Sequence, residues 1–209
     1  AELTHANLYI NCLQVAAIDP DRAFGADRVL GALPFFHVFA NTVVLNLTTH
    51  MGGEIVTLPK FELTQVLKAI SRRKVTIVPG VPTMYTALLG DPHLERYDLS
   101  SIRVCISGGA PMPTELKQRF ETISGSIVVE GYGLTESSGV VAVNPIHGVN
   151  KAGSIGRPLP GPDIIIVDRD NPARVVPQGE PGELCVCGPQ VMRGYWQRAD
   201  ASAGALQNG

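Results

Sequence analysis

The feature that most restricts the fold of this sequence is a regular alternation, between residues 28 and 130, of short apolar runs and longer amphipathic stretches. The short runs are rich in Val and Ile, which favours strands, and the longer stretches repeat apolar residues at helical spacing. An amphipathic helix over residues 3–18 precedes them. The pattern then predicts strand 28–33, helix 37–51, strand 54–58, helix 63–73, strand 75–78, helix 82–89, strand 102–106, helix 114–123 and strand 126–130. We therefore expect an α/β fold whose helices cover a mainly parallel sheet.

The pattern changes after about residue 144. Gly and Pro become more frequent up to residue 196, and the apolar runs become short and alternate with turns such as 160–162. This is typical of β-rich structure. We expect an α/β subdomain over residues 1–147, followed by a β-rich subdomain over residues 148–209.

Composition excludes several classes of protein. The 17 Lys and Arg against 19 Asp and Glu give a formal charge of −2, so no basic surface for nucleic acid is expected. No apolar run reaches the roughly 18 residues that a membrane-spanning helix needs. The four cysteines form no CxxC pair, which favours reduced thiols in a cytosolic protein. We expect small or neutral molecules as partners.

Three loops follow predicted strands, at the ends where open α/β sheets bind ligands. The first is Ser107-Gly108-Gly109-Ala110-Pro111, after strand 102–106. Its two glycines let a ligand approach the main chain closely. The alternative is a tight turn between a strand and a helix.

The second loop, residues 130–139, superficially imitates a dinucleotide fingerprint, but Glu136 replaces the last glycine of that pattern. Tyr132 offers a flat face to a base and Thr135 offers a hydroxyl, while Glu136 offers the hard oxygen that Mg²⁺ prefers. Residues suited to contact a base, a phosphate and a metal ion would thus lie within a few positions of one another in the sequence. The alternative is a glycine-rich turn with a buried Tyr and a capping Thr.

The third loop places His37 among aromatic residues where a strand passes into a helix. Such a histidine belongs to the core, caps the helix or gates an apolar pocket. The sequence has no GxSxG, GxxxxGK[ST] or HExxH motif that would compete with these loops.

Taken together and in this order, the loops resemble those of the adenylate-forming superfamily, which contains acyl-CoA synthetases, luciferases and peptide-synthetase adenylation domains. The resemblance covers nearly the whole chain and is strongest to bacterial long-chain fatty-acid–CoA ligases. The motifs that carry it are LPFFH (33–37), SGGAP (107–111), YGLTE (132–136), GSIGRP (153–158), and GEL (182–184) with GYW (194–196).

The resemblance implies a two-step reaction that uses ATP, Mg²⁺ and coenzyme A. A carboxylate attacks the α-phosphorus of ATP to give an acyl-adenylate and pyrophosphate, and the CoA thiol then displaces AMP. Tyr132 would stack on adenine, Thr135 would contact phosphate and Glu136 would hold Mg²⁺. The implied nucleotide contacts are Gly108, Gly109, Ala110, Pro111, Glu130, Gly131, Tyr132, Gly133, Leu134 and Thr135.

For the acyl substrate, the resemblance places His37 near the carboxylate at the mouth of the pocket. His37, Thr135 and Glu136 form the implied catalytic set. The implied acyl pocket consists of His37, Val81, Gly108, Gly131, Gly139 and Val140.

Other parts of the superfamily pattern are missing from this sequence. They are the phosphate loop expected before Thr4, the ribose-binding Asp expected after Gly209, and the mobile C-terminal domain with its lysine. We expect a central fragment of the large domain that is catalytically inactive alone. The parent is expected in the cytoplasm, with peripheral contact at the inner membrane face left open and its oligomeric state unspecified. The alternatives are an aryl-CoA ligase, an amino-acid adenylation domain, or a module that binds nucleotide or acyl groups without turnover.

Overall fold

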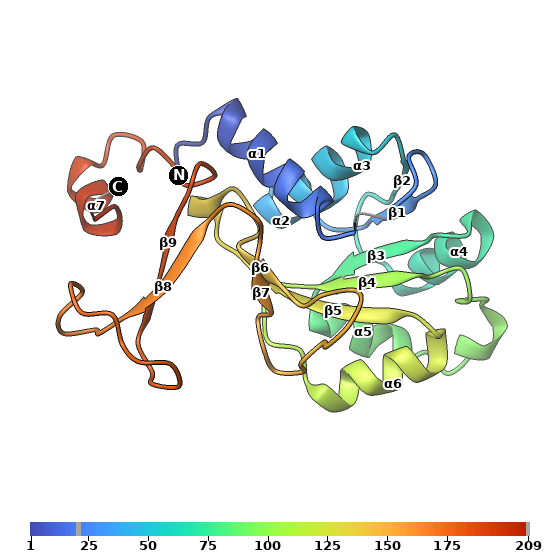
Figure 1. Ribbon diagram of the computed structural model, residues 1–209. Helices are drawn as coiled ribbons and strands as arrows, with labels where there is room; N and C mark the ends of the chain where they lie inside the picture. Colours follow the sequence, from blue (N-terminus) through green and yellow to red (C-terminus); the bar gives the residue numbers. More distant parts are fainter. Residues whose placement is uncertain (20–21, 208–209) are drawn as a thin grey trace.

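The computed structural model describes residues 1–19 and 22–207, and Figure 1 shows the arrangement of its elements. The helices are α1 (His5–Ala16), α2 (Val38–Ala40), η1 (Asn41–Asn46), α3 (Leu47–His50), α4 (Leu63–Arg73), α5 (Pro82–Leu89), η2 (Leu94–Arg96), α6 (Thr114–Ser124), η3 (Thr135–Ser137) and α7 (Ala199–Ala205). The strands are β1 (Arg28–Gly31), β2 (Glu54–Thr57), β3 (Ile77–Gly80), β4 (Val104–Ser107), β5 (Ile127–Tyr132), β6 (Ala142–Val143), β7 (Arg157–Pro158), β8 (Asp163–Val167) and β9 (Glu183–Cys187).

The main sheet has the strand order β2-β1-β3-β4-β5-β6-β7. Its first five strands are parallel, and β6 and β7 add an antiparallel edge next to β5. The expected α/β fold with a mainly parallel sheet is confirmed. Strand β7 comes from beyond residue 147 and still extends the main sheet, while the proposed division at 147/148 stays a prediction.

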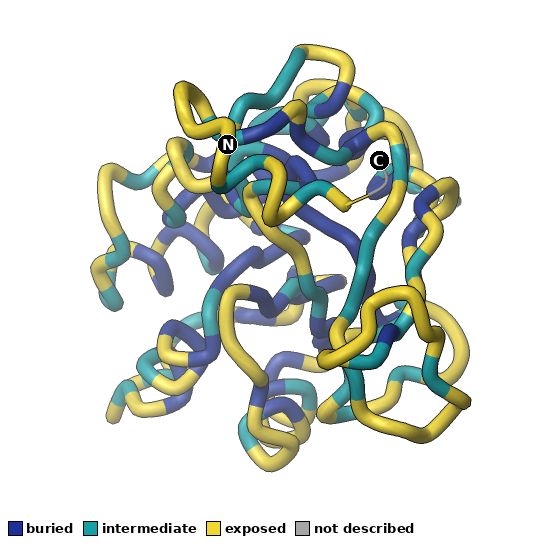
Figure 2. Tube along the Cα trace, turned by 90° about the vertical axis from the view of Figure 1, so that its left-hand side faces the viewer, coloured by how far each residue is buried: buried dark blue, intermediate teal, exposed yellow. Residues whose placement is uncertain are grey.

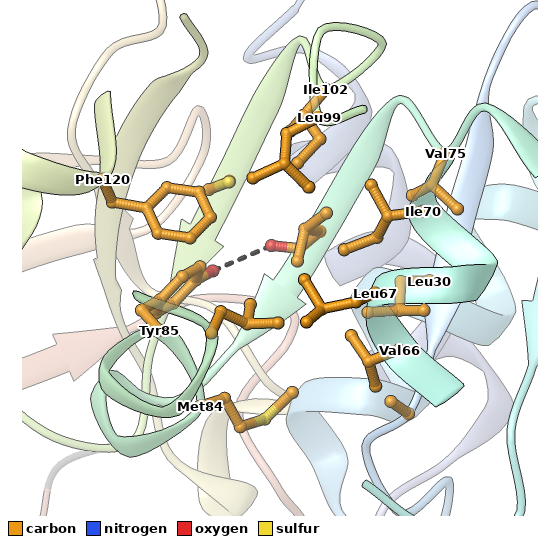
Figure 3. Packing of buried hydrophobic residues seen from close by; sticks show 14 of the residues in the cluster. Leu30, Val66, Leu67, Ile70, Val75, Met84, Tyr85, Leu99, Ile102 and Phe120 are labelled. Carbon is orange, nitrogen blue, oxygen red and sulfur yellow. Dashed lines mark hydrogen bonds between the residues drawn. The ribbon is translucent and has the colours of Figure 1, made fainter. Parts of the chain in front are cut away.

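Helices cover both faces of the sheet (Figure 1). On one face, α4, α5 and α6 enclose a core that contains Tyr85 and Phe120, whose rings meet edge to face with centroids 5.1 Å apart. The buried Tyr85 hydroxyl donates to the main-chain oxygen of Val78 at 2.8 Å, as the dashed line in Figure 3 marks. Complete burial of one such apolar side chain contributes about 1.5–3 kcal/mol.

On the other face, α1 and the helical segment α2-η1-α3 pack against β4 and β5. Cys12 and Val15 of α1 meet Val43 and Leu47 there, above Val104. This second layer covers the sheet edge where the candidate loops emerge. It therefore sets the walls of the candidate site.

The helix expected over residues 37–51 forms, but its middle, η1, is a π-helix. Two contacts fit the wider turn. The Asn46 side-chain amide donates to Oδ1 of Asn41, five residues earlier, at 3.0 Å. The Thr42 hydroxyl donates to the main-chain oxygen of Ser138 at 2.7 Å. The second contact is tertiary, so the periodicity of the helix alone does not predict the widening.

Strands β8 and β9 form a separate two-stranded antiparallel sheet, as expected for a β-rich segment, and Val167 of β8 also makes an isolated bridge to Val175. The hairpin extends away from the main sheet in Figure 1, and Figure 2 shows the buried segments gathered centrally with exposed loops around them. Helix α7, in the small polar tail, was not expected from the sequence. Among the described residues, no helix is both long and apolar enough to cross a membrane.

Candidate functional site

The candidate loops meet at one edge of the sheet because β1, β3, β4 and β5 are parallel and adjacent. A pocket opens there between the sheet and the layer formed by α1, α2 and η1. The space there is about 840 Å³ when the open solvent at its mouth is counted. Several predicted residues line this pocket: His37, Gly108, Gly109, Gly131, Tyr132, Gly133, Gly139 and Val140.

The other predicted residues lie beside the pocket rather than on its wall. Val81 is next to Gly109, since a Cβ built there would lie 3.5 Å from Val81 Cγ1. The remaining residues belong to the same two loops but do not line the pocket: Ala110, Pro111, Glu130, Leu134, Thr135 and Glu136. The roles assigned to all these residues stay predictions.

His37 caps a helix and lines the pocket at the same time. Its Nδ1 accepts a hydrogen bond from the main-chain N–H of Phe39 at 3.2 Å, at the start of α2. An accepting Nδ1 is unprotonated, so in the neutral ring the proton is on Nε2, which remains a donor. The side chain is exposed. The sequence left capping and gating as alternatives, and this geometry allows both.

The loop after β5 is folded tightly on itself. A Cβ on Gly133 would lie 1.5 Å from the main-chain oxygen of Gly139, so only glycine fits at position 133. Gly139 has φ +132°, and a Cβ there would lie 2.7 Å from the Thr42 hydroxyl. These two glycines bring the ends of the loop together beside η1.

Asn11 of α1 fixes the far end of this loop. It is fully buried, its Oδ1 accepts from the N–H of Val140 at 2.9 Å, and its Nδ2 donates to the Val140 oxygen at 2.7 Å. Both polar groups of the Val140 main chain are thereby satisfied inside the protein. The apolar periodicity of the first helix contains no signal for Asn11, because its partner, Val140, is distant in the sequence.

Glu136 is held by the segment that follows β9. The Tyr195 hydroxyl donates to Oε1 of Glu136 at 2.7 Å, and the Met192 N–H donates to its main-chain oxygen at 2.7 Å. This contact raises the pKa of Tyr195, because a neighbouring carboxylate disfavours the phenolate. The sequence motif included Tyr195 but assigned it no role.

The Glu136 carboxylate suits a magnesium ion in one respect. The bond from Tyr195 uses Oε1 and leaves Oε2 open to a ligand. Within residues 1–19 and 22–207 no cluster of three or more His, Cys, Asp or Glu side chains could hold a metal ion. A single carboxylate is nevertheless a common protein contribution to Mg²⁺ sites in which phosphates and water supply the other oxygens. The residues therefore fit a phosphate-bound Mg²⁺.

Glu130 is buried under the loop after β4. Its Oε1 accepts from the Met112 N–H at 3.3 Å, while its Oε2 is buried and has no partner among the described residues. A buried acceptor without a partner is costly, and a bound amine would remove that cost. The side chain thus joins the two predicted nucleotide loops and retains one unused acceptor.

Comparisons with known proteins agree with this geometry. The family of AMP-binding enzymes matches residues 1–196. A long-chain-fatty-acid–CoA ligase of Bacillus subtilis (strain 168) is 46% identical over 207 residues, which is 99% of this chain and 37% of that protein. A feruloyl-CoA synthase of an Amycolatopsis species is 40% identical over 210 residues, which is 100% of this chain and 42% of that protein.

The fold also matches solved structures. The crystal structure of ATP-bound MatB from Rhodopseudomonas palustris has a TM-score of 0.87 and 30% identity, covering 99% of this chain and 40% of that one. As for the curated relatives, the chain spans only part of their length, about 37% of the Bacillus subtilis ligase.

Proposed function

The chain belongs to the family of AMP-binding enzymes, and on that premise we propose that it is part of an ATP-dependent fatty-acid–CoA ligase. The ligase joins a fatty acid to AMP with release of pyrophosphate, and then transfers the acyl group to the thiol of coenzyme A. The observation that carries the proposal is the pocket, which begins between His37, Gly108 and Tyr132 and continues between the sheet and α1. ATP use is supported by the family match and by the ATP-bound relative of known structure.

The walls of the pocket favour an aliphatic tail. Val15, Val43 and Leu47 line one side, and Val104 and Val129 of the sheet line the other. A substrate with a charged amine would need a carboxylate to pair with it. The only carboxylate among the described lining residues is Asp19, which already pairs with Arg103 at 2.7 Å. The interior therefore suits an uncharged chain.

Residues at the mouth of the pocket and beside it bind and orient the reactants. Tyr132 provides a face for adenine, and Glu130 Oε2 provides an acceptor for its amine. Nε2–H of His37 is available to hold the substrate carboxylate against the phosphate. The hydroxyl of Thr135 and the carboxylate of Glu136 face the phosphate groups.

Bound Mg²⁺ would supply charge neutralisation on the phosphates. Glu136 positions that charge, and Tyr195 in turn fixes the carboxylate. Catalysis by these groups is therefore positioning and electrostatic stabilisation rather than proton transfer. We expect the ligase in the cytoplasm, with peripheral contact at the inner face of the membrane.

A panel of acids tests this proposal on the ligase that contains this chain. AMP release is measured with saturated fatty acids, benzoate and amino acids. We expect the fatty acids to have the highest kcat/KM, and Glu136→Gln to lower kcat by about 10²-fold or more, the scale of an electrostatic group lost from a transition state. A higher kcat/KM for an aromatic acid would identify an aryl-CoA ligase instead. AMP release with none of these acids would contradict the ligase assignment.

A further inference from the structure

The inner end of the pocket is charged, although its walls are apolar. The pocket runs from the loops at the carboxyl ends of the strands to the opposite edge of the sheet. There it is lined by Asp19 and Arg22 from the connection between α1 and β1, and by Arg103 directly before β4. These residues, together with the neighbouring Asp27, are called the terminal cluster below.

Most polar groups of the terminal cluster pair with one another. Arg103 Nη1 lies 2.7 Å from Asp19 Oδ2, and its Nη2 lies 3.3 Å from Asp27 Oδ2. The Thr76 hydroxyl donates to the other oxygen of Asp27 at 2.7 Å. Asp27 is therefore held from the sheet side, and Asp19 has its own cation.

Arg22 is the exception. Its side chain is 4% exposed, and Nε lies 2.5 Å from Asp27 Oδ2, which pairs the charges without an aligned hydrogen bond. Both Nε and Nη2 are buried and have no hydrogen-bond partner among the described residues. An unsatisfied buried donor costs about 1–3 kcal/mol, and more when it is charged. Donors of this kind on the wall of a ligand pocket are satisfied when the ligand supplies an acceptor.

We propose that Arg22 binds an oxygen at the distal end of the acyl chain, so that the preferred substrates are fatty acids with a neutral oxygen function at that end, such as an ω-hydroxyl. This inference rests on the proposed function, because it assigns the far end of the same acyl pocket. The apolar walls select the aliphatic body of the chain, and Arg22 selects its terminus.

The charge balance of the terminal cluster favours a neutral oxygen over a second carboxylate. Among the residues that the structure describes there, two arginines face two aspartates, so their charges balance. A carboxylate would add a buried negative charge beside Asp19 and Asp27, with the desolvation cost of such a charge. A hydroxyl adds no charge, accepts from Arg22 and keeps a proton that an aspartate oxygen can accept.

The experiment uses the ligase that contains this chain and three series of acids of increasing length. Each series ends in a methyl group, a hydroxyl or a carboxylate, and kcat/KM is measured for every acid. At the length that reaches Arg22, we expect the hydroxy acid to exceed the methyl-terminated acid by about tenfold, which equals about 1.4 kcal/mol. Arg22→Met, which keeps an unbranched side chain but removes the charge and every donor, should bring this ratio close to one.

Arg174→Met is the matched control. Arg174 pairs with Asp168 at 2.7 Å in the β8–β9 segment and does not line the pocket, so the ratio should be retained. A methyl-terminated acid that equals the hydroxy acid at every length in the unmodified ligase would overturn the inference, whether or not Arg22→Met folds. Preference for the carboxylate series would overturn the neutral terminus. If no acid of any series is activated, the ligase assignment fails and this inference fails with it.

Discussion

Tyr195 positions the predicted catalytic residue Glu136 from a distant part of the sequence. Its hydroxyl donates to Glu136 across 59 positions of the chain. The bond fixes one oxygen of the carboxylate and leaves the other for a ligand. The tyrosine therefore orients Glu136 without competing for its second oxygen.

The pKa of Tyr195 tests this contact. The carboxylate raises the pKa of Tyr195 above the ordinary value of about 10. The bond therefore stabilises the fold fully below about pH 10 and ceases to do so as the pH rises through the raised pKa. We expect Glu136→Gln to lower the pKa of one tyrosine in a spectrophotometric titration of tyrosinate.

Tyr195→Phe provides the control, because it should remove Tyr195 from the titration, while Tyr85, whose pKa is raised by burial, remains in every variant. Adding Glu136→Gln to that variant should then change the curve no further. Identical curves for the unmodified chain and Glu136→Gln would contradict the contact.

At the scale of elements, local signals placed the helices well. Helices α4 and α5 have the predicted bounds, 63–73 and 82–89. The Glu62 side chain caps α4 by accepting from the N–H groups of Thr64 and Gln65, and Pro82 begins α5. Such start signals are local, so the sequence contains them.

Strand bounds and the π-helical turn depended on distant partners. Strands β3 and β4 begin two residues later than predicted, at Ile77 and Val104, because pairing with neighbouring strands decides where each ladder starts. The π-helical turn η1 is tied to the loop after β5 through Thr42 and Ser138. Periodicity within one segment contains no signal for either.

The loop after β5 makes an element-scale prediction. In Gly133→Ala the new Cβ would overlap the main-chain oxygen of Gly139, so the loop must open. We expect the free energy of unfolding, measured with denaturant, to fall by about 3 kcal/mol or more.

Gly204→Ala is the matched control, because a Cβ at that position of α7 meets nothing within 4 Å. It should leave the stability unchanged or raise it by up to about 1 kcal/mol. Equal stabilities of the two variants would show that the loop has a looser path than the one described.

At the scale of the molecule, the sequence predicted which loops meet but not what supports them. Parallel topology alone brings the loops after β1, β4 and β5 to one edge. Two side chains support these loops: Asn11, which bonds to Val140, and Tyr195, which bonds to Glu136. Both come from segments that are distant in the sequence and lie next to the loops only in the folded chain. The sequence also contains no signal for the charged inner end of the pocket, because its side chains come from two distant places, the connection after α1 and the residue before β4, and belong to no motif.

The stability of the molecule should be uneven. Strands β3, β4 and β5 are central in the main sheet and covered on both faces, whereas β8 and β9 form a separate two-stranded sheet. We expect amide hydrogen exchange, followed by mass spectrometry, to report a lower opening free energy for residues 163–187 than for 104–107. Equal protection in both segments would mean that the hairpin opens only when the whole domain unfolds.

The bridge between Glu2 and Gly194 connects the segment before α1 to the segment whose Tyr195 holds Glu136. The N–H of Glu2 donates to the Gly194 oxygen at 2.7 Å, and the Arg193 N–H donates to the Glu2 oxygen at 3.0 Å. Tyr195 is the next residue along that extended segment. In such pairing, a slip of one residue turns each side chain to the opposite side. The pairing of Glu2 with residues 193 and 194 thus contributes to the register in which Tyr195 points at Glu136 and not away from it.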